Sequence, residues 1–284
     1  MHTSKLTSNF LTLDLEEWYD AELPKRKLRD RFDKNSKLDF QVNLFLDLCA
    51  RNDVKATIFV VGRVAQENKS LIKRISDEGH EVASHSFDHG LVYNKDRNSF
   101  INDLQKSVGV LEGITGKKVY GFRAPSWSVN REVSEWYYDC LKQESLIYSS
   151  SVFPGKTFLY GYPEAEENIH KVHQGIVEIP QQLVSFGGKK LGFSGGFYLR
   201  VLPGFLIKKF IKKKNDAGNP VFIYTHPWEL SKERLDVELS NFERVLQFYG
   251  VKSNIEKIDS IVKDYSSSFS LMKDFALASF NRDS

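Results

Sequence analysis

Two histidines four residues apart, His85 and His89, directly follow a strand-like run in this chain of 284 residues. Four residues make about one helical turn, so both imidazoles can point to the same side and share one metal ion. A divalent ion needs at least a third protein ligand, and an apolar run upstream ends in three candidates, Asp14, Glu16 and Glu17. Two histidines plus one carboxylate, with positions left open for water, are typical of catalytic rather than structural metal sites. The spacing therefore predicts metal-assisted hydrolysis.

Length and composition indicate a soluble globular protein with one large core. The chain has the size of an α/β barrel domain, and its 41% hydrophobic and 27% charged residues are ordinary values. The net charge of +3 is too small to indicate a nucleic-acid partner. Cys49 and Cys140 each lie in a helix-like apolar pattern, which predicts buried free thiols. We expect a cytoplasmic protein, because the sequence contains no signal peptide and no apolar run of the ~18 residues that a membrane span needs.

Apolar, β-branched runs alternate with helix-period segments along the chain. The pattern predicts strands at 10–14, 55–62, 81–84, 119–123, 146–149, 177–180 and 220–225, and helices at 38–51, 71–78, 100–111 and 132–143. This alternation implies a parallel sheet, and at this length a barrel is favoured over an open sheet. We predict one α/β domain over 1–284, with a core at about 10–230 and a helical remainder at 231–284. The glycine-rich segments 186–188 and 192–196 are expected to flank irregular loops at one rim of the barrel.

Clusters of polar residues stand just after predicted strands. These clusters are 14–17, 85–89, 123–127 and His226. In parallel α/β proteins the C-terminal ends of the strands converge on the active site. Four clusters at such ends are more specific than any one of them, so we expect a single active site built from all four.

Together these motifs resemble those of the polysaccharide deacetylases of the NodB-homology group, carbohydrate esterase family 4. The similarity runs from about Phe10 to Leu230 and is greatest to the branch whose first motif reads Asp-x-Glu-Asp-Trp. The matching motifs are Ala56-Thr57-Ile58-Phe59-Val60-Val61-Gly62, Gly79-His80-Glu81-Val82-Ala83-Ser84-His85, Gly121-Phe122-Arg123-Ala124-Pro125-Ser126-Trp127 and Tyr224-Thr225-His226-Pro227-Trp228-Glu229. The resemblance implies a distorted (β/α) barrel with about seven parallel strands. It also implies one divalent ion, zinc in the first place and otherwise cobalt, nickel or manganese, and removal of an N-acetyl or similar acyl group from a sugar.

The resemblance gives roles to the acids and to the arginine. Asp14 matches the carboxylate that takes the proton of the attacking water, and Arg123 matches the arginine that pairs with this base. Asp14 and Glu16 face the same side of a strand, which favours Glu16 as the third metal ligand beside the two histidines. Glu17 stays a competitor, because it stands where close relatives carry Asp and because strand ends often twist.

Further roles concern the leaving group and the sugar. The backbone N–H of Ser126 would face the tetrahedral oxyanion, and His226 would protonate the leaving amine, a task that suits imidazole because its pKa lies near working pH. Trp18, Trp127 and Trp228 lie beside these groups in the sequence and are candidates for apolar walls against which a sugar ring stacks. Packing in the core or at the rim is the alternative for each tryptophan.

Position 149 departs from the family pattern. Relatives carry Tyr-Asp-Ser-Ser, in which the Asp orients the catalytic histidine, whereas this chain has Ser149. A serine can form a hydrogen bond but cannot stabilise an imidazolium by charge. The pKa of His226 and the rate of hydrolysis are therefore expected to be lower than in relatives. Glu229 is an acid that could take over the task.

Two questions about partners and chemistry stay open at this point. The segment 205–214 predicts a basic amphipathic helix, which is either an ordinary barrel helix or a contact with an anionic membrane surface. The expected substrate is an N-acetylated glycan or a sugar precursor. The alternatives are hydrolysis of a formamido or cyclic amide compound, and a catalytically inactive sugar-binding relative. The sequence predicts no oligomeric state.

Overall fold

A curled sheet forms the centre of the protein, whose computed structural model describes residues 8–22, 36–157, 160–231 and 239–280. Its strand order is β10-β1-β2-β3-β4-β5-β7-β6, and all neighbours are parallel except β6 and β7. The strands are β1 (Phe10–Leu15), β2 (Thr57–Val60), β3 (Glu81–Ser84), β4 (Gly121–Phe122), β5 (Tyr148–Ser149), β6 (His170–Lys171), β7 (Val177–Glu178) and β10 (Phe222–Thr225). The predicted α/β fold, a distorted barrel with about seven parallel strands, is confirmed.

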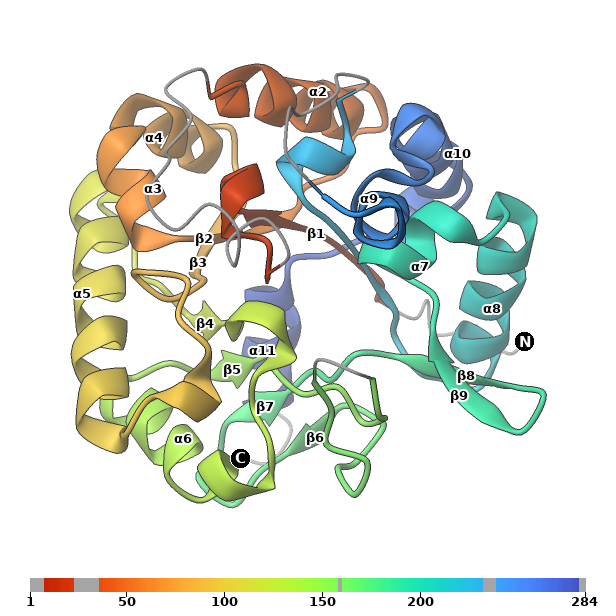
Figure 1. Ribbon diagram of the computed structural model, residues 1–284. Coiled ribbons are helices and arrows are strands. Elements are labelled where there is room, and N and C mark those ends of the chain that lie inside the picture. The colour runs from red at the N-terminus through yellow and green to blue at the C-terminus, as the bar shows by residue number, and fades with distance from the viewer. Residues whose placement is uncertain (1–7, 23–35, 158–159, 232–238, 281–284) are drawn as a thin grey trace, which may run out of the picture.

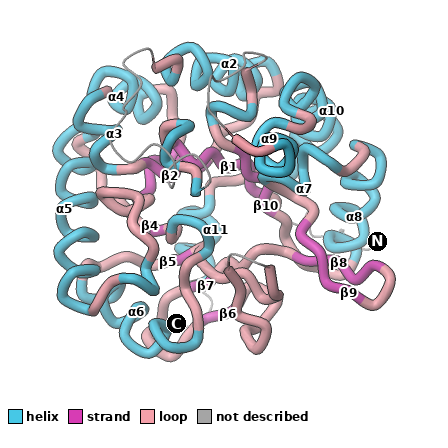
Figure 2. The backbone as a smooth tube through the Cα atoms, viewed as in Figure 1, coloured by secondary structure: helices cyan, strands magenta, loops and turns pink. Residues whose placement is uncertain are grey.

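Helices surround the sheet, as the view along the barrel shows (Figures 1 and 2). The helices of the described residues are α2 (Leu38–Arg51), α3 (Gly62–Glu67), α4 (Lys69–Asp77), α5 (Arg97–Thr115), α6 (Arg131–Gln143), α7 (Gly196–Val201), α8 (Gly204–Asp216), α9 (Asn241–Phe248), α10 (Asn254–Tyr265) and α11 (Met272–Phe280), of which α11 lies at the centre of the view, inside the ring. Local sequence sets several ends: Asp96 caps α5 by accepting from the backbone N–H of Ser99, and α5 ends at Gly116 in a left-handed conformation. The helices cover the outer face of the sheet, and every residue of β1, β2 and β3 is buried.

The C-terminal segment closes the N-terminal end of the barrel. The backbone N–H of Met272 donates to the hydroxyl of Thr57 at 3.1 Å, and that of Lys273 donates to Glu81 at 3.1 Å. The ring of Phe275 packs edge-on against Phe10, with centroids 5.4 Å apart. These partners belong to the first residues of β1, β2 and β3. One end of the barrel is therefore occupied by α11, which leaves the C-terminal strand ends for a site.

The segment 183–196 is more ordered than predicted. Leu183–Phe186 (β8) and Lys189–Gly192 (β9) form an antiparallel hairpin, and α7 begins at Gly196. Gly187 and Gly188, at the turn, have φ of +57° and +76°. Two adjacent residues with positive φ are the geometry of a two-residue hairpin turn, so the prediction of an irregular loop was wrong because this turn signal was overlooked.

The basic segment 205–214 forms a helix as predicted, within α8. Ile207 and Ile211 on its inner face are buried in the main core. Within the described residues, no helix combines the length and the apolar character that crossing a bilayer requires.

Candidate active site

The polar clusters that follow β1, β3, β4 and β10 meet at the C-terminal end of the barrel. A cavity of about 430 Å³ lies between them. The strand ends contribute Asp14, Glu16, His85, His89, Arg123 and His226 to its lining. β1 lies between β10 and β2 in the sheet, so its last residues stand in the middle of the group. The parallel register thus produces the convergence that the sequence predicted.

Glu16, His85 and His89 place three potential metal-binding atoms within 4.8 Å of one another, and all three residues are buried. The Oε2 of Glu16 lies 2.6 Å from the Nε2 of His89 and 3.9 Å from the Nε2 of His85. The Nδ1 of His85 lies 2.8 Å from the backbone oxygen of Arg123, so this nitrogen carries the proton and donates. The Nε2 of His85 therefore presents its lone pair to the other two side chains. This donor set fits a divalent ion of the zinc type.

Burial and neighbouring charges set the ionisation of this group. Burial lowers the pKa of His85 to about 4. Burial alone would raise the pKa of Glu16, but the charges of His89 and His226 outweigh it and lower this pKa to about 2. At neutral pH the carboxylate is therefore charged and His85 is neutral, and these are the forms that bind metal.

The two histidines lie on a loop, and the one-turn helical spacing used to predict their approach is wrong. The segment 85–90 is irregular, and within it Ser86 and His89 have φ of +63° and +55°. The carboxylate of Asp103 in α5 accepts from the backbone N–H of Phe87 at 3.0 Å. A Cβ on Gly62 would lie 2.7 Å from the ring of Phe87, so the close approach requires glycine. Left-handed backbone, held by these contacts, brings the two rings to 5.1 Å between centroids.

Asp14 and Arg123 form a buried ion pair beside the three metal-binding candidates. The Nη1 of Arg123 donates to Asp14 at 2.6 Å and to the hydroxyl of Thr12 at 2.9 Å, and its Nη2 donates to the hydroxyl of Ser150 at 3.1 Å. The guanidinium lies over the ring of Phe59, 4.0 Å from its centroid. The pair engages Oδ1 of Asp14 and leaves Oδ2 for other contacts.

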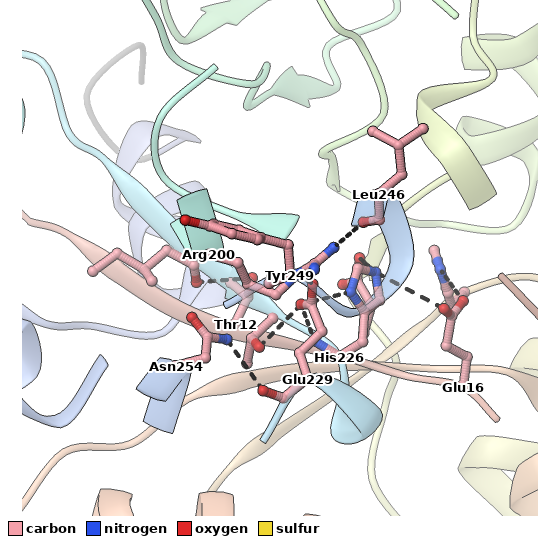
Figure 3. A network of polar contacts seen from close by, with 12 residues as sticks. Thr12, Glu16, Arg200, His226, Glu229, Leu246, Tyr249 and Asn254 are labelled. Atoms are coloured by element: carbon pink, nitrogen blue, oxygen red, sulfur yellow. Dashed lines mark hydrogen bonds and ion pairs between the residues drawn. The ribbon is translucent and has the colours of Figure 1, made fainter. Parts of the chain in front are cut away.

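The partner of His226 is Glu229, which the sequence offered only as an alternative. The Nδ1 of His226 lies 2.9 Å from Oε2 of Glu229. Its Nε2 lies 4.0 Å from Asp14 and 3.9 Å from Glu16, so the other edge of the ring faces the cluster (Figure 3). Burial alone would lower the pKa of His226, but the charges of Glu229 and Glu16 outweigh it and raise this pKa to about 9. The indole of Trp228 stacks on the imidazole at 5.3 Å and 12°.

Ser149 does not face His226, so the expectation of a lower pKa for His226, which assumed that residue 149 is the partner of this ring, had a wrong premise. The Oγ of Ser149 lies 2.9 Å from the hydroxyl of Tyr137, which belongs to α6 on the outside of the barrel. The next residue, Ser150, points inward to Arg123. Successive side chains of a strand alternate between its two faces, which is why position 149 turns outward.

Two other predicted residues also turn away from the cavity. Glu17 accepts a hydrogen bond from the hydroxyl of Ser36 at 2.5 Å, and with Asp20 it caps the short 3-10 helix Trp18–Asp20. Burial raises the pKa of Glu17. Trp18 packs in a separate cluster with Trp228. Glu16, rather than Glu17, thus lies with the histidines.

The motif after β4 forms a strained turn at the cavity. Ser126 and Trp127 both have φ of +51°, and both line the cavity. Trp127 stacks on Phe222 inside the barrel, with centroids 5.7 Å apart. Trp228 also lines the cavity. Non-glycine residues in left-handed conformations cost energy and often mark functional turns.

Arg200 is a site residue that the sequence analysis missed. It lies in α7, is 4% exposed, and its Nε donates to Oε1 of Glu229 at 2.6 Å. No motif or spacing connects it to His226. The sequence feature that could have identified it is a single basic residue within the apolar run Phe197-Tyr198-Leu199-Arg200-Val201, which indicates a buried charge.

Sequence comparison divides the chain into two matched regions. The family described as polysaccharide deacetylase matches residues 23–140, and a domain of unknown function (DUF3473) matches residues 150–276. The peptidoglycan-N-acetylglucosamine deacetylase PgdA of Listeria monocytogenes is 34% identical over 118 residues, which cover 40% of this chain and 25% of PgdA. The peptidoglycan-N-acetylmuramic acid deacetylase PdaA of Bacillus subtilis is 25% identical over 165 residues, 50% of this chain and 62% of PdaA. The matches thus span less than two thirds of these relatives.

Solved structures share the fold over nearly the whole chain. A protein from Mycobacterium smegmatis described as a polysaccharide deacetylase aligns with a TM-score of 0.63 at 17% identity, covering 98% of this chain and 92% of that one. A carbohydrate esterase family 4 pseudoenzyme from Bacillus anthracis aligns with a TM-score of 0.54 at 16% identity, covering 96% and 66%. Residues 23–140 thus belong to the polysaccharide deacetylase family, and nearly the whole chain shares the fold of these structures.

Proposed function

We propose that this protein is a metal-dependent deacetylase that removes N-acetyl groups from the amino sugars of a polysaccharide or of its precursor. The observation that carries the proposal is the presence of three complementary groups in one cavity. These are the metal-binding trio, the buried acid–arginine pair, and the imidazole held by a carboxylate. Amide hydrolysis needs an activated water, a base and an acid, and each group suits one of these tasks. The peptidoglycan deacetylases among its relatives support an N-acetylated glycan as the substrate.

Glu16, His85 and His89 would hold the ion, with zinc as our first choice. When bound, a divalent ion there supplies a water nucleophile at neutral pH and polarises the acyl carbonyl. The tautomer of His85, fixed by its contact with the backbone oxygen of Arg123, keeps one nitrogen ready for this role.

The remaining residues move protons and stabilise charge. As the new C–O bond forms, Asp14 takes a proton from the attacking water, while Arg123 keeps the Asp14 carboxylate aimed. The backbone N–H of Ser126 stabilises the tetrahedral oxyanion. As the C–N bond breaks, the protonated His226 gives its Nε2 proton to the nitrogen, so the products are a free amine and acetate. Trp127 and Trp228 line the cavity, but their rings are buried against Phe222 and His226, which favours the packing role over stacking on a sugar ring.

The experiment that tests this function measures acyl release by purified protein, before and after chelation and with zinc restored. We expect acetate from N-acetylglucosamine oligomers, loss of release after chelation and recovery with the ion. Asp14→Asn, which removes the base and none of the trio, is the matched inactive control. Release of formate from an N-formyl sugar without release of acetate would support the formamide alternative. Glycan binding with full metal content and no release of either acid would support an inactive sugar-binding relative.

A further inference from the structure

Four donors surround the carboxylate of Glu229, which is fully buried. Its Oε2 accepts from the Nδ1 of His226 at 2.9 Å, from the backbone N–H of His226 at 3.0 Å and from the hydroxyl of Thr225 at 3.2 Å. Its Oε1 accepts from the Nε of Arg200 at 2.6 Å. Glu229 thus joins two groups, with the imidazole on one oxygen and the guanidinium on the other (Figure 3). The orientation of His226 therefore depends on how firmly the carboxylate is held from the Arg200 side.

Arg200 itself is held by backbone carbonyl oxygens at the C-terminal end of α9. Its Nη1 donates to the carbonyl oxygen of Tyr249 at 2.7 Å, and its Nη2 donates to that of Leu246 at 2.8 Å. These oxygens belong to the last turn of α9 and the residue that caps it, where carbonyls lack helical partners and favour a cation. All three nitrogens of the guanidinium thus have fixed acceptors, and only one acceptor is a side chain. A planar fork with three such bonds cannot move without breaking several of them.

The same contacts connect the imidazole to a wall of the cavity. Leu246, whose oxygen Arg200 engages, and its neighbour Gln247 both line the cavity. The Nδ2 of Asn254 in α10 also donates to the backbone oxygen of Glu229 at 3.4 Å. The wall formed by α9 and the Nδ1 edge of His226 are therefore linked through two buried side chains, Arg200 and Glu229.

We propose that Arg200 is a positioning residue for the deacetylation, which fixes the Glu229 carboxylate on His226 and couples this pair to α9. The proposal rests on the proposed function, since it concerns the proton that His226 gives to the leaving nitrogen. It assigns the region 150–276, the part matched by the domain of unknown function, a share in catalysis: this region supplies His226, its carboxylate and the arginine behind it. Without Arg200, a buried carboxylate would lose its only cationic side-chain partner besides His226 among the described contacts, and its hold on the ring would loosen.

The test compares two substrates that need the acid to different extents. The leaving group of an N-acetyl amide is an amine, which must be protonated as the C–N bond breaks. The leaving group of 4-nitrophenyl acetate is a stable phenolate, which needs no proton. We expect Arg200→Ala to lower kcat on an N-acetylglucosamine oligomer by about 10- to 100-fold, part of the roughly 10²- to 10⁴-fold that a positioned acid contributes. Hydrolysis of the ester by the same preparation should stay close to that of the wild type, with KM for the amide little changed.

Arg200→Lys keeps a buried cation near Glu229 but loses the fork to α9, so it decides the question if Arg200→Ala does not fold. We expect it to lower the amide-to-ester ratio in the same direction by a smaller factor. The matched control is Lys257→Met. The Nζ of Lys257 donates to the carbonyl oxygens of Leu199, Arg200 and Leu202 at 2.8–2.9 Å. Its loss therefore weakens the C-terminal end of α7, which carries Arg200, but spares the ion pair between Arg200 and Glu229. Its amide-to-ester ratio should equal that of the wild type.

The outcomes separate this inference from the proposed function. A wild-type protein that releases no acetate from the amide overturns the proposed function. A wild-type protein that is active on the amide, with equal losses on amide and ester in both Arg200 variants, shows a purely structural role and overturns the positioning role. An unchanged amide rate in either folded variant overturns it as well. A lower ratio in the Arg200 variants, with none in Lys257→Met, supports it.

Discussion

Three neighbouring acids should give three different results when each is replaced by its amide. Asp14 pairs with Arg123, Glu16 lies with the histidines, and Glu17 bonds to Ser36 outside the site. All three are buried and lie within four positions of the chain, so each substitution removes one buried carboxylate from the same short segment. The differences between the variants therefore report the direction of each side chain rather than a general loss of charge.

The magnitude for Asp14→Asn follows from what the amide keeps and what it loses. The amide oxygen still accepts from the Nη1 of Arg123, at present 2.6 Å from Oδ1, but it cannot take a proton from water. We expect turnover to fall by roughly 10²- to 10⁴-fold, or about 3–5 kcal/mol of activation free energy, with the metal content unchanged. The free energy of unfolding should fall by about 1–3 kcal/mol, because a charge-assisted bond becomes a neutral one beside a buried guanidinium.

Glu16→Gln should lose the metal itself. Its carboxylate is the anionic member of the trio, 2.6 Å from the Nε2 of His89, and a neutral amide oxygen is a weaker ligand for a dication. We expect affinity for zinc to fall by about 100-fold or more, beyond the 10- to 100-fold that is usual when an outer partner of a ligand is lost. Glu17→Gln should keep both the metal and the turnover, because its amide oxygen can still accept from Ser36.

The assay is elemental analysis after dialysis at equal free zinc, followed by acetate release from the same samples. If Glu17→Gln empties the site and Glu16→Gln leaves it filled, the choice of ligand is wrong. If Asp14→Asn loses the metal, then Asp14 is a ligand and cannot be assigned as the base. Equal losses of activity in all three variants, with the metal retained, would show that the loss reflects the removal of charge from the segment.

Three further results are expected. His85→Ala or His89→Ala should abolish zinc loading, measured by elemental analysis. Circular dichroism should show a retained fold, because both residues lie on a rim loop. Full zinc occupancy in the double variant contradicts the assignment of these histidines as metal ligands. Burial raises the pKa of Glu81 above its ordinary 4.5, so the folded state binds this proton more tightly than the unfolded chain, and its favourable effect on folding is lost as pH rises from about 4.5 through the raised pKa. Glu81→Gln should therefore gain stability relative to the wild type as the pH rises above about 4.5 in guanidinium titrations, and a stability difference that does not change with pH contradicts the assignment. Ser149→Asp places a second carboxyl beside buried Glu178, the register partner of position 149 on β7. It should lower the free energy of unfolding by about 3–5 kcal/mol and leave the pH–rate profile unshifted. A shifted profile would mean that residue 149 reaches His226.

The fold could be predicted from the sequence wherever a buried element had an unambiguous period. The apolar run of β1 and the helix-period pattern of α2 each predicted their element directly. The alternation of strand-like and helix-like segments along the chain implied the parallel barrel. The hairpin β8–β9 was missed because its strands alternate weakly and the decisive feature was the pair Gly187-Gly188. The role of α11 could not be predicted either. Its contacts with Thr57 and Glu81 join residues more than 190 positions apart, and no local pattern reports such a contact.

The site was predictable where a short motif follows a strand. Asp14, His85, His89, Arg123 and His226 were identified in this way, because the C-terminal ends of parallel strands must meet. Direction was harder to predict than position. Alternation along the strand favoured Glu16 over Glu17, and the structure places Glu16 with the histidines. The same alternation, applied to β5, would have turned Ser149 outward.

The substitution at position 149 has a physical explanation in the turn that follows β10. His226 and Glu229 lie three residues apart, and the short 3-10 helix Pro227–Glu229 brings the carboxylate back onto both the backbone N–H and the ring of His226. An orienting group within one turn needs no register between distant strands, whereas a carboxylate on β5 would have to reach β10 across the barrel. Position 149 faces α6, so its serine has no part in orienting His226, and the turn supplies the carboxylate that Arg200 holds in place. The absence of the family's usual Asp is therefore compatible with an oriented acid in this chain.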